Sequence, residues 1–135
     1  MKVMTYSFQP GDILLLYGGN STFDRLEKWA LGSPFVHCMI YWTETKRRLP
    51  LIIESIGKGV VIQPLLNYEG RKLKWLRHKD RSAGLQASKA AEHIADRQDS
   101  FYDYRAITRW VLPRIIYQKL GLPVPLSWHR NRYFL

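Results

Sequence analysis

A histidine and a glutamate on consecutive apolar segments are the residues of this chain that could do chemistry together. His37 stands near the start of the segment 36–42, and Glu54 lies in the next segment, 51–56. A neutral imidazole can take a proton from a nucleophile, and an acceptor on its other ring nitrogen fixes its tautomer. Side chains on one face of adjacent antiparallel strands lie side by side. The pair is therefore predicted to be the base and the orienting acid of a nucleophilic site.

The nucleophile of such a site is not evident. Cys38 is the only cysteine, but neighbouring residues on a strand point to opposite faces, so its thiol should face away from the His37 ring. A lone cysteine in an apolar strand is usually a small core residue, so we expect Cys38 to be buried. Ser127 is a weaker alternative, because nothing around it resembles a nucleophile elbow.

Metal and cofactor sites are not expected. A single cysteine excludes an internal disulfide and a multi-cysteine zinc site. The other histidines are His78, His93 and His129, and no pair among the four has ligand spacing with a nearby carboxylate. We therefore predict neither a metal nor a cofactor.

Length and hydropathy predict one folded domain. The chain has 135 residues, of which 46% are hydrophobic, enough to bury a core within a single domain over 1–135. The apolar run 13–17 is too short to cross a bilayer, and the N-terminus lacks the basic and apolar regions of a signal peptide. We expect no transmembrane segment and a cytoplasmic location. The oligomeric state is not predicted.

The charge of the chain favours an anionic partner. Its net charge is +10, and basic residues gather at 46–48, 71–81 and 105–132. Nucleic acid, an anionic lipid surface or an acidic polymer would all suit this balance. No zinc-finger spacing or RNA-binding strand motif sharpens the nucleic-acid interpretation. Solubility alone also explains any single basic cluster.

Strands are predicted at 12–17, 36–42, 51–56, 60–62 and 72–77. The 36–42 strand is expected to lie centrally, beside 51–56, because both are apolar and a short turn joins them. An early helix, a run of short strands and two late helices indicate an α+β domain with an antiparallel sheet and packed helices.

Helices are predicted from caps and periodicity. Ser21 and Asp24 fit a capping box, Gly32 is a natural stop, and Phe23 and Leu26 have helical spacing, so a helix over 22–31 should pack on the sheet. A second helix is expected over 82–97. Its sheet-facing side should consist of small residues and one isoleucine, namely Ala83, Ala87, Ala90, Ala91 and Ile94. Asp103 can cap a third helix, which Pro113 should kink or end, and the tail after Gly121 should be extended.

Taken in order, these segments resemble a known family. They are Pro-Gly-Asp-Ile-Leu-Leu at 10–15, Ser-Pro-Phe-Val-His at 33–37, Glu54, Gly59-Val60, Arg77 and Phe-Tyr-Asp-Tyr at 101–104. The ordered set is similar to the circularly permuted NlpC-type cysteine hydrolases, papain-like proteins related to the lecithin:retinol acyltransferase group. The resemblance spans nearly all of the chain. It implies a permuted papain-like fold, with His37 as general base and Glu54 as the residue that orients it.

The resemblance also implies the type of reaction. Family members act as amidases, peptidases or acyltransferases on amide or ester bonds of peptides, peptidoglycan or lipids. Their cysteine opens a late helix, and residues 127–135 resemble the approach to it. Either the 135 residues end before the nucleophile, or they form a degenerate relative that has lost it. We favour the first explanation, and in both cases we expect the residues to be inactive as they stand. The alternative interpretation is a non-catalytic basic module that binds an anionic polymer, nucleic acid or a membrane surface.

Overall fold

The computed structural model describes residues 7–57, 59–97 and 112–123. Along the chain, its elements are β1 (Ile13–Tyr17), α1 (Thr22–Leu31), β2 (Phe35–Glu44), β3 (Pro50–Ile56), β4 (Gly59–Pro64), the 3₁₀ helix η1 (Leu65–Tyr68), β5 (Leu73–Leu76), α2 (Arg81–Ala95) and α4 (Leu112–Lys119). The helix predicted to start at Asp103, and most of the tail after Gly121, lie outside these residues.

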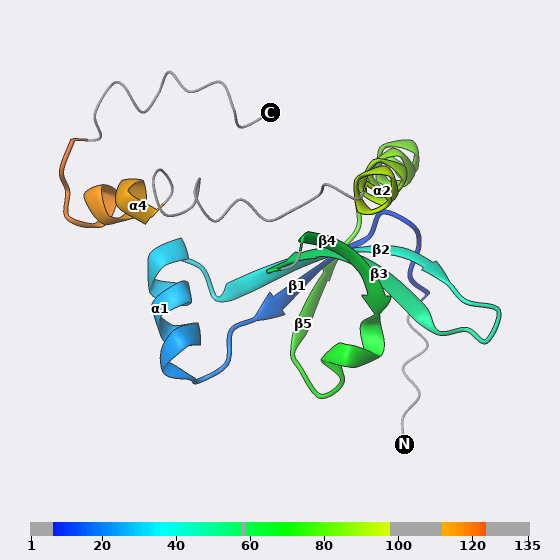
Figure 1. Cartoon of the computed structure of the whole chain (residues 1–135), viewed down its shortest axis with the longest axis horizontal. Helices are drawn as coiled ribbons and strands as arrows, with labels where there is room; N and C mark the ends of the chain where they lie inside the picture. Colours follow the sequence, from blue (N-terminus) through cyan, green and yellow to red (C-terminus); the bar gives the residue numbers. More distant parts are fainter. Residues whose placement is uncertain (1–6, 58, 98–111, 124–135) are drawn as a thin grey trace.

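A five-stranded antiparallel sheet forms the centre of the structure, in the order β4-β3-β2-β1-β5. The predicted central position of the 36–42 strand, next to 51–56, is confirmed. Figure 1 shows α1 and α4 at one end of this sheet and α2 at the other. The mixture of helices and antiparallel strands confirms the α+β class.

One face of the sheet carries the core. Leu14, Leu16, Met39 and Ile52 form its buried cluster, against which Tyr68 of η1 also packs. Register places Leu14 opposite Met39 and Leu16 opposite His37. Because side chains alternate between faces, His37 belongs to the core face of β2, at its end nearest α1.

Helix α1 has the predicted bounds and the predicted contact with the sheet. The Ser21 hydroxyl accepts a hydrogen bond from the Asp24 amide at 3.1 Å, and Gly32 ends the helix with φ +61°. The helix contacts β2, yet it buries no residue, and Phe23 and Leu26 are exposed. The helix therefore lies against the sheet as expected, but it does so without burying its apolar side chains.

Helix α2 packs through a different face from the predicted one. Its buried residues are Gly84 and Ser88. Of the five residues of the predicted face, Ala83 and Ala91 are half-buried, whereas Ala87, Ala90 and Ile94 are exposed. The cause is a backbone contact: a Cβ added to Gly11 would lie 1.9 Å from the Gly84 carbonyl oxygen. Two glycines meeting this closely fix the rotation of the helix, and that contact outweighs the alanine pattern.

Pro113 is the second residue of the described helix α4, which continues to Lys119. The helix that Pro113 is expected to kink or end lies outside the described residues, so that expectation stays a prediction. Proline is compatible with a helix's first turn, where its missing N–H costs nothing. Gly121, with φ +67°, follows, and its amide donates to the Gln118 carbonyl, closing the helix.

Candidate functional site

His37 and Glu54 meet on the core face of the sheet. Glu54 lies opposite Met39 in the β2–β3 register, so His37 is its diagonal neighbour on the same face. The two side chains form a hydrogen bond between His37 Nε2 and Glu54 Oε2. The Glu54 side chain is fully buried, and that of His37 is 24% exposed. The predicted proximity of the two side chains is confirmed.

This bond determines which nitrogen of His37 can act as a base. A carboxylate oxygen accepts, so Nε2 carries the proton in the neutral ring and Nδ1 keeps its lone pair. Within the described ranges, Nδ1 has no hydrogen-bond partner. The imidazole is therefore held by one nitrogen and can take up a proton at the other.

Tyr68 is a third member of the site that the sequence did not reveal. Its hydroxyl donates to the same oxygen, Glu54 Oε2, at 2.5 Å, and its ring lies 6.3 Å from the His37 ring at an interplanar angle of 26°. Burial, and then the bond to and charge of Glu54, raise the pKa of Tyr68. The phenol therefore stays protonated at neutral pH and holds the carboxylate in place.

The His37 ring borders an open cleft of about 640 Å³. Its wall combines apolar, acidic and basic side chains: Leu16, Phe23, Asp24, Glu27, Val36, His37, Ser55, Ile56, Gly57, Tyr68 and Arg71. The first turns of α1 and the chain around η1 thus both contribute to the wall of a space next to the base. Such a cleft can admit a polar, partly apolar substrate.

Cys38 confirms one expectation and corrects another. It pairs with Leu15 of β1, and its neighbours in the strand are His37 and Met39 on the core face. Cys38 therefore points to the opposite face, as predicted. It is exposed rather than buried, because that face of the strand is not covered at this position. Nearby protein atoms still desolvate the thiol and raise its pKa, which disfavours the reactive thiolate.

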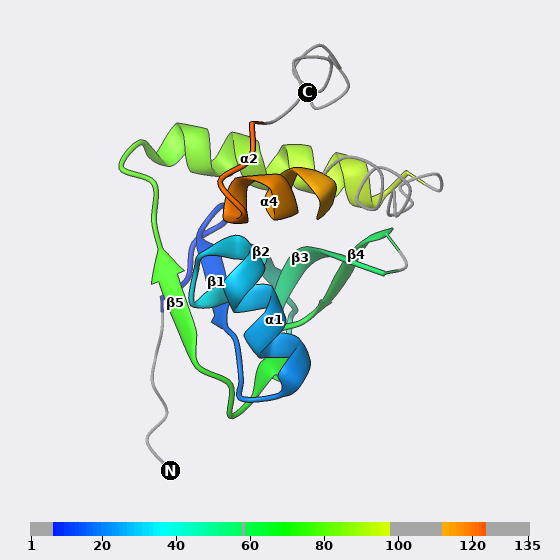
Figure 2. The same cartoon turned by 90° about the vertical axis from the view of Figure 1, so that its left-hand side faces the viewer.

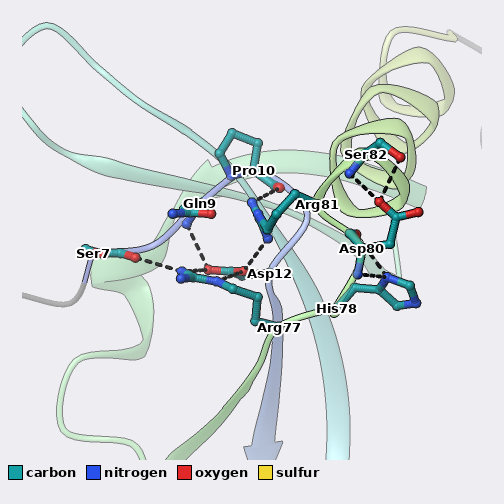
Figure 3. Close-up of polar contacts among 9 residues, drawn as sticks. All are labelled: Ser7, Gln9, Pro10, Asp12, Arg77, His78, Asp80, Arg81 and Ser82. Atoms are coloured by element: carbon teal, nitrogen blue, oxygen red, sulfur yellow. Dashed lines mark hydrogen bonds and ion pairs between the residues drawn. The ribbon is translucent and has the colours of Figure 1, made fainter.

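Asp12, which is buried, forms a second polar cluster (Figure 3). Its carboxylate accepts bonds from Arg77 Nε at 2.8 Å and Nη2 at 2.7 Å, and from the Gln9 amide at 2.8 Å. Arg81 Nη1 lies 3.5 Å away. Burial acts to raise the pKa of Asp12, but these hydrogen bonds outweigh it and lower the pKa.

The cluster is structural rather than catalytic. Arg77 also donates to the Ser7 carbonyl at 2.8 Å, and Arg81 donates to the Pro10 carbonyl at 3.3 Å. The N-terminal turn, the end of β5 and the start of α2 are thereby joined at one carboxylate. The Pro-Gly-Asp motif and Arg77 were visible in the sequence, but their mutual contact was not.

Two further features bear on function. In 7–57, 59–97 and 112–123, no three His, Cys, Asp or Glu side chains gather in a way that could bind a metal. No helix of those ranges is both long and apolar enough to cross a membrane. Ser127 and His129 lie outside the described residues.

Comparison with protein-family models gave no match, and comparison with curated proteins gave none either.

Proposed function

We propose that this chain forms the base-bearing part of a cysteine hydrolase of the permuted NlpC type, which acts on amide or ester bonds. The observation that carries the proposal is the His37–Glu54 pair at the border of a cleft, with Nδ1 of the imidazole free of the carboxylate. The ordered motifs of the sequence support the family. The antiparallel sheet with helices is compatible with it.

His37 would act as the proton carrier of the reaction. Its Nδ1 takes the proton of a thiol, and the thiolate attacks the carbonyl carbon of the substrate. Glu54 stabilises the resulting imidazolium, and Tyr68 keeps Glu54 oriented. The imidazolium then returns the proton to the leaving amine or alcohol, giving an acyl-enzyme that water hydrolyses.

The thiol is the part that the 135 residues do not supply. Their one cysteine, Cys38, lies on the other face of β2 from His37. On this proposal, the chain as given turns over no substrate, because loss of the nucleophile can cost on the order of 10⁶ in turnover. The attacking cysteine would come from additional chain encoded with these residues.

Labelling with iodoacetamide tests this proposal. The 135-residue chain should label slowly, through Cys38. A protein extended by whatever its gene encodes beyond Leu135 should contain a second cysteine that labels fast at neutral pH. That fast phase should slow at least about tenfold in His37→Ala, because the base that forms the thiolate is removed.

The matched control is His93→Ala, which removes an exposed histidine of α2 and should leave both phases unchanged. Fast labelling of Cys38 that depends on His37 would show that Cys38 is the nucleophile. A gene with no further cysteine, or a fast phase that His37→Ala does not alter, would refute the proposal.

A further inference from the structure

Helix α1 is amphipathic, but its apolar side chains face solvent and several of its polar side chains face the protein. Asp24, Glu27 and Lys28 are half-buried against the rest of the protein, whereas Leu26 and Trp29 are exposed. Phe23 is exposed too, and each of these three apolar side chains keeps more than half of its surface accessible. A helix normally buries its apolar stripe. In α1 that stripe faces solvent.

Helix α4 enlarges this apolar surface. It contacts α1, and Figure 2 shows the two helices on the same side of the molecule. The Lys119 ammonium lies 5.8 Å from the centroid of the Trp29 ring. We define the α1–α4 face by six of the exposed apolar residues on the two helices and just after α4, namely Phe23, Leu26, Trp29, Leu112, Ile116 and Leu120.

The charges around the α1–α4 face have one sign. Arg25 of α1 and Lys119 of α4 are exposed, the Lys119 ammonium lies over the Trp29 ring, and Leu112–Lys119 contains no acidic residue. The acids of α1, Asp24 and Glu27, instead line the cleft. The outer surface of the two helices is therefore apolar and cationic.

This combination selects among possible occupants. A second copy of the chain would bring the same cations together, which is unfavourable. Nucleic acid needs the cations but gains little from exposed Leu and Ile. An anionic bilayer satisfies both, because its acyl region takes the apolar side chains, its headgroups attract Lys and Arg, and Trp favours the interface.

We propose that the α1–α4 face docks onto an anionic lipid surface, with both helices lying along the headgroup layer. This interaction does not depend on the chemistry proposed for His37. Arg25 and Lys119 reach the headgroups while Leu26 and Ile116 enter the acyl boundary. The protein is held from one side and does not span the bilayer.

Co-sedimentation with vesicles tests the docking. The protein should bind vesicles of phosphatidylcholine mixed with phosphatidylglycerol, and bind pure phosphatidylcholine far less. Leu26→Glu and Ile116→Glu should each weaken binding at least about tenfold, because a buried apolar contact is replaced by an anion. Arg25→Gln with Lys119→Gln should weaken it about fivefold per charge.

Matched controls come from α2, which lies at the far end of the molecule (Figure 1). Leu85 is 44% exposed, close to the 42% of Ile116, and Lys89 is an exposed cation. Leu85→Glu and Lys89→Gln should bind as the unmodified protein does. Circular dichroism should show that all variants are folded, since every changed side chain is at the surface.

Any one of three results would overturn the docking proposal. The unmodified protein could fail to bind anionic vesicles, it could bind both vesicle types equally, or the α2 control variants could lose as much binding as the variants of the α1–α4 face. A dimer in sedimentation that Leu26→Glu dissociates would assign the face to a second copy instead.

Discussion

Two buried carboxylates, Asp12 and Glu54, have different kinds of partner. Asp12 is bound by Arg77, whose guanidinium carries a permanent charge. Glu54 is bound by His37 and Tyr68, whose ring nitrogen and hydroxyl can exchange protons. The first arrangement fixes structure, and the second permits proton transfer. This contrast is why we place chemistry at Glu54 and stability at Asp12.

Asp12→Asn should reveal the structural role of its carboxylate. Near neutral pH, the change should lower the free energy of unfolding by about 2–4 kcal/mol, because the charged bonds from Arg77 are lost. The pKa of Asp12 in the folded protein lies below its ordinary value of 3.8. Its contribution is therefore complete above that value and is lost as pH falls through the folded pKa.

Urea unfolding at a series of pH values measures this effect. The difference between the unmodified protein and Asp12→Asn should be constant at neutral pH and shrink below about 3.8. Asp96→Asn, at an exposed carboxylate that ends α2, should change the free energy by less than about 0.5 kcal/mol. A difference that grows towards acid pH would contradict the assignment.

At the level of elements, the contact between Gly11 and Gly84 sets the position of α2. Gly11 has φ +89° and approaches Gly84 so closely that no Cβ fits. The same turn carries Asp12, which holds Arg81 at the start of the helix. The close approach of Gly11 to Gly84 and the ion pair of Asp12 with Arg81 thus together fix the N-terminal end of α2.

Gly11→Ala and Gly70→Ala form a matched pair that isolates this contact. Both glycines have positive φ, but a Cβ at Gly70 would meet nothing within 4 Å. Gly70→Ala should cost only backbone strain, about 1 kcal/mol. Gly11→Ala should cost at least about 2 kcal/mol more, because α2 must shift. Thermal or urea unfolding measures both, and equal losses would contradict the close approach.

The sequence predicted where helices begin and end better than it predicted which side of each helix packs against the rest of the protein. The bounds of α1 followed from Ser21 and Gly32, since a cap and a left-handed stop are local signals. The faces of α1 and α2 depend on distant contacts. Alanine spacing could not show that Gly84, rather than Ala87, faces the N-terminal turn, and periodicity could not show that Leu26 faces solvent.

On the scale of the whole molecule, the candidate site was only partly predictable. Strand alternation placed His37 and Glu54 together, because both lie on segments with clear apolar patterns. Tyr68 could not be found, because its position depends on the turn of η1 back over the core face. No local pattern encodes such a return of the chain.

The two candidate surfaces differ in charge. The cleft beside His37 is lined by Asp24, Glu27 and the basic Arg71, whereas Arg25 and Lys119 are exposed cations of α1 and α4. Helix α1 contributes to both the candidate site and the candidate lipid surface, since Phe23, Asp24 and Glu27 line the cleft. Phe23 belongs to both, so docking would bring the cleft near the bilayer.

Nitrogen NMR of the His37 ring in the 135-residue chain tests the central claim most directly, because it observes the base without requiring a nucleophile. At a pH where the imidazole is neutral, its ring proton should reside on Nε2, and Nδ1 should be unprotonated. The Nε2–H proton should exchange slowly with water and therefore give an observable resonance. Glu54→Ala should abolish that resonance, and Glu92→Ala on α2 should leave it unchanged. A proton on Nδ1, or an Nε2 resonance that persists in Glu54→Ala, would contradict the assignment of His37 as a base held by Glu54.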